Sequence, residues 1–411
     1  MKHAVIIDTT MTTPPTGGSH KFLVDLCAPL AARGWSLSFV TQPGPEQGIV
    51  EALRATGADV RERVWRGTHL PEERAERLAA WVNSQRPDAY VVSTSPDAGW
   101  LALPLLDAAI PTVSVAHNDV GAYYEPLKHY GALLDCAVGV SGEILRRIVE
   151  ECGVPPARAR RIPYGVYTLP EALALARVEA STAAGGPLKI GYIGRVVVEQ
   201  KRVLEMAPLA AELERRGVDF ELHVVGDGEA RGRLEEELRR LGVGGRVKFW
   251  GWLAPDEVRR RLSELDVFLL MSDYEGLSVA LLEAMGHALA PVVTEIRSGT
   301  GEVVRDGQSG FLVTVGDIKT FADRIERLAR DPQLLASLKR GAWEASRPYT
   351  VERMADAYVE CFEVARALSS QRSAGAPRRP GFPAMPSCRS RYPFWLRKIK
   401  RGLLASTGRG R

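Results

Sequence analysis

The sequence has few cysteines and no long apolar run, and both absences exclude classes of protein. Its five cysteines form no Cys-x-x-Cys pair and no Cys/His cluster, so neither a zinc site nor a disulfide framework is expected. The apolar runs, such as residues 267–271, are far shorter than the roughly 20 residues of a membrane-spanning helix. Residues 1–8 lack the apolar segment and cleavage site of a secretory signal, so we expect a cytoplasmic protein.

Acidic residues are missing from the last part of the chain. Residues 369–411 contain 11 Lys and Arg and no Asp or Glu. Since the whole chain has a formal net charge of +4, residues 1–368 have a net charge of −7. An acidic globular part argues against binding of nucleic acid. The basic tail mixes aromatic, aliphatic and cationic residues between Tyr392 and Leu404. Two interpretations stay open: docking on an anionic membrane surface, or a disordered, solubilising appendage.

The remaining sequence alternates short apolar strands with helical stretches. Strand, loop, helix and strand form a βαβ unit, which implies a parallel sheet. The 411 residues are too many for one core, and residues 168–187 interrupt the alternation. We therefore predict an α/β protein of two doubly wound, Rossmann-like domains that face a central cleft. The predicted strands are residues 4–7, 37–40, 90–92, 112–115 and 137–140, and then 189–193, 221–225, 247–249, 267–270, 291–294 and 310–313. The predicted parts are a first domain at 1–167, a linker at 168–187, a second domain at 188–349, a closing helix at 350–368 and the tail at 369–411.

Residues 272–285 carry the most informative pattern. A buried strand is predicted to end just before them, and a helix to open near residue 277. The backbone N–H groups of Gly276, Leu277 and Ser278 would then be free to bind an anion such as phosphate.

Two acids flank this predicted anion site. Glu275 precedes the helix and Glu283 lies within it, so both carboxylates can accept hydrogen bonds from the hydroxyls of one ligand. The alternative is a first-turn acid and a solvated helix acid.

Cations and glycines follow other strands of the second half. Arg195 and Lys201 follow the strand at 189–193, where they would neutralise a diphosphate; alternatively they are surface charges. Gly226 begins a Gly-Asp-Gly turn that admits a base or ribose, or is a plain turn.

In this order, the Gly-Arg…Lys, Val-Gly-Asp-Gly and Glu-x7-Glu motifs resemble the retaining nucleotide-sugar glycosyltransferases of family 4, which have the GT-B fold. The resemblance covers residues 4–368. It implies that Arg195 and Lys201 hold the donor diphosphate and that Glu283 binds the ribose. Glu275 and the amides at the helix start would meet the donor sugar and phosphate.

The first half adds looser matches to this family. Gly17 and Gly18 resemble its glycine-rich loop, which approaches the donor and acceptor closely. His117 follows a strand and corresponds to the family's cleft histidine. A lone histidine is more often structural, but its position at a strand end favours a catalytic role here, together with Glu275. Tyr164 stands where the family usually has Asn.

The resemblance implies a retaining, metal-independent transferase of the hexosyltransferase type that needs no cofactor, since the nucleotide-sugar is a substrate. We expect Arg195, Lys201 and the helix amides to stabilise the leaving diphosphate in place of a metal ion. The expected partners are a nucleotide-sugar donor, a glycan or lipid-linked acceptor and, through the tail, the inner leaflet of the cell membrane. The expected role is synthesis of cell-surface polysaccharide, lipopolysaccharide or glycolipid.

Alternative functions remain open. One is another GT-B enzyme, either a sugar-nucleotide epimerase or a glycosyl phosphorylase, and product analysis with and without phosphate identifies the latter. Another is a catalytically silent GT-B-like scaffold, which would have no need of the acids, cation and histidine named above. A dehydrogenase is disfavoured because no Gly-x-Gly-x-x-Gly opens a helix with an acid about 20 residues further on.

Overall fold

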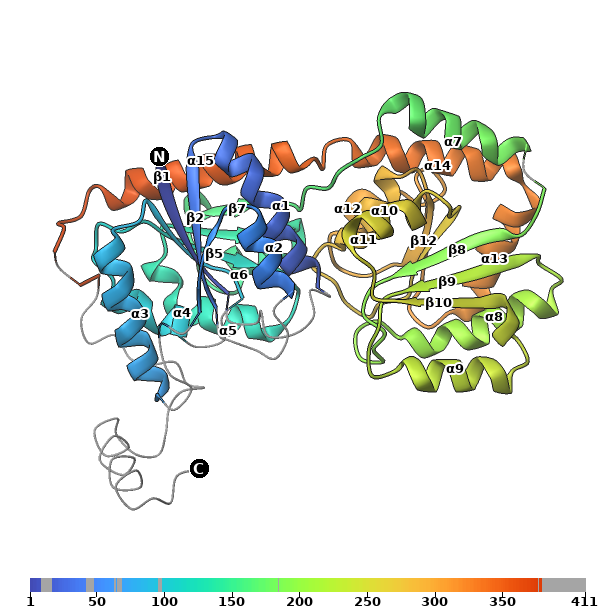
Figure 1. Cartoon of the computed structure of the whole chain (residues 1–411), viewed down its shortest axis with the longest axis horizontal. Helices are drawn as coiled ribbons and strands as arrows, with labels where there is room; N and C mark the ends of the chain where they lie inside the picture. The colour runs from blue at the N-terminus through green and yellow to red at the C-terminus, as the bar shows by residue number, and fades with distance from the viewer. Residues whose placement is uncertain are drawn as a thin grey trace, which may run out of the picture.

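The structure is a computed structural model that describes residues 1–8, 17–41, 48–62, 64, 69–94, 98–183, 185–375 and 377–378. Two α/β domains lie side by side; helix α14 runs along the carboxy-terminal domain and helix α15 along the amino-terminal domain (Figure 1). None of the helices within the described residues is both long and apolar enough to cross a lipid bilayer.

The amino-terminal domain is a seven-stranded parallel sheet with strand order β3-β2-β1-β4-β5-β6-β7. Central strands such as β5 are buried throughout, as expected for a parallel sheet that helices cover on both faces. The strands are β1 (Lys2–Ile7), β2 (Trp35–Thr41), β3 (Asp59–Glu62), β4 (Ala89–Val92), β5 (Thr112–Ala116), β6 (Cys136–Gly139) and β7 (Ala159–Arg161). The helices are α1 (Gly18–Ala32), α2 (Gly48–Ala55), α3 (Pro71–Gln85), α4 (Ala98–Ala102), α5 (Gly121–Tyr130) and α6 (Gly142–Glu150).

The carboxy-terminal domain has a six-stranded parallel sheet with strand order β10-β9-β8-β11-β12-β13. The strand order reverses between β8 and β11, and ligands of doubly wound sheets bind outside the carboxyl ends of the strands at such a point. The strands are β8 (Leu188–Ile193), β9 (Phe220–Val225), β10 (Val247–Gly251), β11 (Val267–Leu270), β12 (Ala290–Thr294) and β13 (Phe311–Val313). The helices are α8 (Met206–Arg215), α9 (Arg231–Arg240), α10 (Pro255–Leu262), α11 (Val279–Gly286), α12 (Thr300–Val303), α13 (Ile318–Arg330) and α14 (Pro332–Ser346).

Two helices connect the domains. The predicted linker contains α7 (Glu171–Ala183), which packs on α14 of the carboxy-terminal domain (Figure 1). Helix α15 (Val351–Ser369) occupies the predicted closing-helix segment and packs on α1 and on strands β4 to β6 of the amino-terminal domain. The amino-terminal domain therefore contains both the first strand of the chain and its last helix.

The first residues of the predicted tail differ from the expectation of a disordered segment. Arg372 and Arg378 both donate to the fully buried carboxylate of Asp135, over 2.6 and 3.1 Å. The two cations neutralise a charge that would be costly to bury alone. Residues 370–375, 377 and 378 are thus fastened to the amino-terminal domain, and residues 379–411 lie outside the described residues.

Candidate active site

The loops after β8 and β11 bring together residues that the sequence predicts at the donor site. Ser272 Oγ donates to Glu275 Oε1 over 2.7 Å, and Lys201 forms an ion pair with the same oxygen. Glu275 is buried, and the side chain of Lys201 is mostly buried. Because β8 and β11 flank the reversal of strand order, this paired acid and cation lie where the fold places a ligand.

Arg195 joins the same cluster through Gln200, which belongs to no predicted motif. Arg195 is exposed, and its Nη2 donates to Gln200 Oε1 over 2.8 Å. A guanidinium has five N–H donors, so the remaining ones can still bind an anion. The predicted cations Arg195 and Lys201 therefore lie beside Glu275, with Gln200 between them.

The start of α11 provides the predicted backbone donors. Ser278 caps the helix, since its Oγ accepts a hydrogen bond from Leu281 N over 3.2 Å. Gly276, Leu277 and Ser278 are buried residues, and their amides have no acceptor among the described residues. Buried N–H groups without a partner at the start of a helix suit a bound anion.

The domains touch beside these amides. A Cβ on Gly276 would lie 2.2 Å from the carbonyl oxygen of His117, at the end of β5. A Cβ on Gly18 would lie 2.9 Å from Val279 Cγ2, and Gly17 caps α1 with its carbonyl accepting from His20 N over 3.1 Å. The predicted glycine loop of the first half therefore lies against the predicted phosphate site of the second.

The imidazole of His117 is buried with both ring nitrogens hydrogen-bonded. Nε2 lies 2.9 Å from Ser93 Oγ and Nδ1 lies 2.7 Å from Tyr164 Oη. The two rings are nearly parallel, with 7° between their planes and centroids 5.9 Å apart. Burial, with a smaller effect from His20, lowers the pKa of His117 to about 3. The ring is therefore neutral at physiological pH and suited to hydrogen bonding, not to proton uptake.

Glu283 has a different neighbour from Glu275. Its carboxylate lies 3.2 Å from Lys21 Nζ of α1, in the other domain, and Lys21 also pairs with Asp25. Burial raises the pKa of Glu283, although Lys21 opposes the rise. Burial would lower the pKa of Lys21, but Glu283 and Asp25 outweigh it and raise it. Helices α1 and α11 thus face each other across the domain junction (Figure 1).

Gly226 has a structural reason to be glycine. Its φ is +127°, and a Cβ there would lie 1.9 Å from the carbonyl oxygen of Gly194. Its amide donates to Gly251 O over 2.7 Å. The close approach of these backbones after β8, β9 and β10 accounts for Gly226, and a contact with base or ribose stays a prediction.

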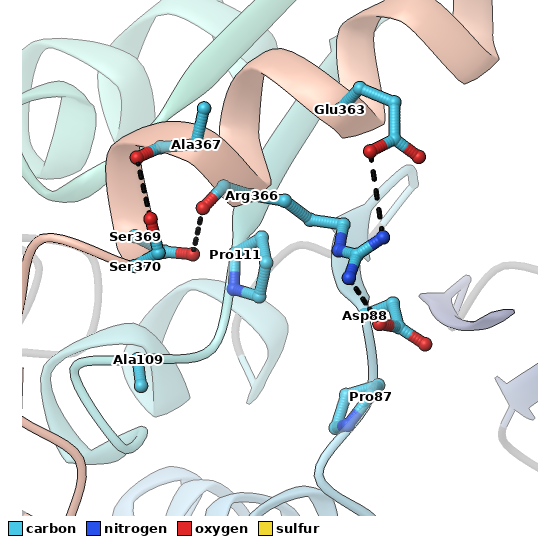
Figure 2. Close-up of a pocket in the computed structure, with 9 residues that line it drawn as sticks. All are labelled: Pro87, Asp88, Ala109, Pro111, Glu363, Arg366, Ala367, Ser369 and Ser370. Atoms are coloured by element: carbon cyan, nitrogen blue, oxygen red, sulfur yellow. Dashed lines mark hydrogen bonds and ion pairs between the residues drawn. The ribbon is translucent and has the colours of Figure 1, made fainter.

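A hollow of about 510 Å³ lies at the amino ends of the strands of the amino-terminal sheet, on the side away from the candidate site (Figure 2). Pro87 and Asp88 directly precede β4, and Pro111 precedes β5, so the hollow is at the amino ends of these strands. Arg366 of α15 reaches Asp88 over 3.3 Å across it. Since His117 follows the carboxyl end of β5, this hollow is separate from the candidate site. Its other lining residues are Ala109, Glu363, Ala367, Ser369 and Ser370.

The contacts of Gln200, Ser93 and Lys21 were not foreseen from the sequence. Gln200 had a weak signal, because it lies in the same strand-to-helix loop as Arg195 and Lys201. Tyr164 was noted only as a departure from the family pattern, and the structure makes it the partner of His117. No sequence pattern indicates that Lys21 meets Glu283.

Solved glycosyltransferases share this fold. A glycosyltransferase from Rickettsia africae superposes with a TM-score of 0.71 at 14% identity, covering 89% of this chain and 98% of that one. Anabaena Alr3699/HepE in complex with UDP and glucose gives a TM-score of 0.71 at 19% identity, covering 88% of this chain and 100% of that one. The architecture is therefore the GT-B fold of glycosyltransferases.

Sequence comparisons narrow the class. The family "Glycosyltransferase Family 4" matches residues 16–168, and "Glycosyl transferases group 1" matches residues 187–331. The lipopolysaccharide core biosynthesis glycosyltransferase LpsE of Rhizobium meliloti is 29% identical over 346 residues, which are 84% of this chain and 95% of LpsE. The alpha-D-kanosaminyltransferase of Streptomyces kanamyceticus is 33% identical over 151 residues, 37% of this chain and 39% of that one. The chain belongs to the family 4 glycosyltransferases and is a transferase of sugar residues.

Proposed function

We propose that the protein transfers a sugar from a nucleotide-sugar to a hydroxyl group of a saccharide or lipid-linked acceptor, with retention of configuration and without a metal ion. The observation that carries this proposal is the paired Glu275 and Lys201 beside the free amides that start α11. An anion and a hydroxylated ring can be bound together there, because both acceptors and donors converge at the switch point.

The diphosphate would bind between the cations and the helix start. Arg195 and Lys201 offer N–H donors from the loop after β8, and Gly276, Leu277 and Ser278 offer amides from the loop after β11. Negative charge grows on the phosphate as the bond to the sugar breaks. Donors that are already in place stabilise that charge without reorganising, which lowers the barrier.

The acids would hold the two sugars of the donor. Glu275 accepts from hydroxyls of the transferred sugar, while Ser272 and Lys201 keep its carboxylate in place. Glu283 accepts hydrogen bonds from the ribose hydroxyls, which bind beside Lys21 or displace its ammonium group from the carboxylate. The acceptor hydroxyl attacks the sugar on the face from which the diphosphate departs.

His117 would act as a hydrogen-bonding group at the domain junction. Its neutral ring exchanges the bond to Ser93 or Tyr164 for a hydroxyl of the donor sugar. Its carbonyl already lies against Gly276, so the ring is close to the phosphate site.

The relatives support a role in cell-surface saccharide synthesis. LpsE is named for lipopolysaccharide core biosynthesis, and two further relatives are a lipopolysaccharide 1,6-galactosyltransferase and a putative colanic acid biosynthesis glycosyltransferase of Salmonella typhimurium. HepE is described in complex with UDP-glucose. We therefore place a UDP-sugar first among the donors to be tested. Epimerase, phosphorylase and scaffold functions have no comparable support.

A thermal-shift screen against UDP-, GDP-, ADP- and TDP-sugars tests the proposal. A ligand at 100 times its dissociation constant adds about 2.7 kcal/mol to the stability of the folded protein. One nucleotide class should raise the melting temperature, and Arg195→Ala should reduce the rise. Arg215→Ala is the matched control, because this exposed cation of α8 pairs with Glu212 and lies outside the site. No shift with any of the four classes would contradict the proposed donor.

A further inference from the structure

Gln200 combines burial with an unfavourable backbone conformation in the loop after β8. Its φ is +72°, a left-handed conformation that residues with a Cβ rarely adopt. Gln200 is also buried, whereas its neighbours Val198 and Glu199 are exposed. Such strain persists only where surrounding contacts impose it. The loop therefore turns this one side chain inward at a conformational cost.

The contacts of Gln200 explain the direction of that turn. Its Oε1 accepts from Arg195 Nη2 over 2.8 Å, and its Nε2 donates to Tyr274 O over 3.2 Å. The same Nε2 lies 3.4 Å from Glu275 Oε2. A guanidinium only donates and a carboxylate or carbonyl only accepts, so the amide is oriented by its partners. Its backbone carbonyl accepts from Asp273 N over 2.8 Å, which fixes the residue to the loop after β11.

The neutral amide of Gln200 lies between the guanidinium of Arg195 and the carboxylate of Glu275 and keeps these opposite charges apart. Without it, Arg195 would be free to swing onto Glu275, and neither group would remain available for a ligand. With it, Gln200 and Lys201 hold one oxygen each of the Glu275 carboxylate. The guanidinium of Arg195 is held by one bond and keeps its other donors exposed.

We propose that Gln200 is a positioning residue of the transferase, which orients Arg195 toward the diphosphate and Glu275 toward the transferred sugar. The inference rests on the proposed function, because Arg195 and Glu275 bind the donor only if that function holds. Gln200 would act through these two side chains, which it contacts directly.

Calorimetry with UDP, GDP, ADP and TDP, together with steady-state kinetics, tests this role. Gln200→Met keeps the length of the side chain but removes the amide, so the affinity for the bound diphosphate should fall 3- to 10-fold and kcat at least 10-fold. Gln200→Glu should reduce kcat further, because a second carboxylate would face Glu275. Glu199→Ala changes an exposed neighbour in the same loop and should keep the wild-type values.

A double-mutant cycle separates positioning from a general effect on the fold. In an Arg195→Ala background, Gln200→Met should change diphosphate affinity less than 2-fold, because Gln200 then has no guanidinium to orient. An equal loss in both backgrounds would overturn the inference, as would an unchanged kcat in Gln200→Met. If none of the four diphosphates binds the wild-type protein, the proposed donor is wrong. This result differs from one in which the wild type binds but Gln200→Met has no effect, which contradicts only the role of Gln200.

Gln200→Gly keeps the test valid if Gln200→Met folds poorly. Glycine adopts the left-handed conformation without strain, so the backbone of the loop should be kept in this variant. Its kcat should nevertheless fall at least 10-fold, since the amide is missing. A fully active Gln200→Gly variant would show that only the backbone of this residue matters and would overturn the inference.

Discussion

The buried imidazole of His117 should make the amino-terminal domain lose stability as the pH falls. Burial lowers its pKa from 6.5 to about 3 in the folded protein. The unfolded chain therefore binds a proton between these values that the folded chain does not, so stability is full above pH 6.5 and is lost toward pH 3. For this shift the free energy of unfolding decreases by about 2 kcal/mol between pH 8 and pH 5.

Urea unfolding of the wild type and of His117→Gln at pH 8 and pH 5 measures this contribution. Glutamine does not titrate, so the wild type should lose about 2 kcal/mol more than the variant between the two pH values. Tyr164→Phe is the control: it removes the hydroxyl that contacts Nδ1 but leaves the ring buried, so it should lower stability at both pH values and keep the pH dependence. Equal pH dependence of wild type and His117→Gln would refute the view that the ring stays neutral.

Other predictions concern the donor acids, metal ions and the carboxy-terminal segment. Glu283→Ala should weaken nucleoside diphosphate binding in calorimetry, whereas Glu275→Ala should lower kcat more than it lowers that affinity; equal effects would remove the division of roles. Turnover should persist in EDTA, because cations and helix amides stabilise the leaving phosphate; loss that Mg²⁺ or Mn²⁺ restores would contradict this. Arg378→Met should cost about 3 kcal/mol in urea unfolding, since buried Asp135 loses one of two cations, and should leave diphosphate affinity unchanged. A chain ending at Arg378 should keep activity on a soluble acceptor but no longer sediment with anionic vesicles. Each cation near an anionic surface contributes about 1 kcal/mol to binding. If the 411-residue protein does not bind the vesicles at low salt, residues 379–411 do not dock it on a membrane.

The central strands of both sheets and the edge strands β10 and β13 of the carboxy-terminal sheet could be predicted from sequence, but the two edge strands of the amino-terminal sheet could not. Strands such as β11 are buried on both faces and therefore appear as uninterrupted apolar runs. The edge strands β3 (Asp59–Glu62) and β7 (Ala159–Arg161) were missed because charged residues occupy most of each. Their pairing with β2 and β6 comes from the sheet, not from a local apolar pattern.

Helix α7 within the predicted linker is held by contacts with residues distant in sequence. Arg177 of α7 donates to the carbonyl of Leu265 over 2.8 Å, and Trp343 Nε1 donates to Leu169 O over 3.0 Å. These partners are distant in sequence and could not be predicted. The helix itself does have a local signal, because the segment is rich in Ala, Leu and Glu and its buried residues Ala174, Val178 and Ser181 lie on one helix face. The attachment of Arg372 and Arg378 to Asp135 has no such local signal.

The candidate site was predictable to the extent that the parallel topology determines it. Residues after β8 and β11 must meet at one edge of the sheet, which explains why Lys201 and Glu275 were expected together. The inward turn of Gln200 depends on loop conformation, and the pairing of Lys21 with Glu283 depends on how the domains face each other. Neither property is encoded in a short motif.

A crystal structure of the protein with the nucleoside diphosphate that the thermal screen selects would test the central claim most directly. The diphosphate should lie between Arg195, Lys201 and the amides of Gly276 to Ser278, at the carboxyl ends of β8 and β11. Glu283 should then contact the ribose. A diphosphate bound elsewhere, for example in the hollow at the amino ends of β4 and β5, would contradict the account.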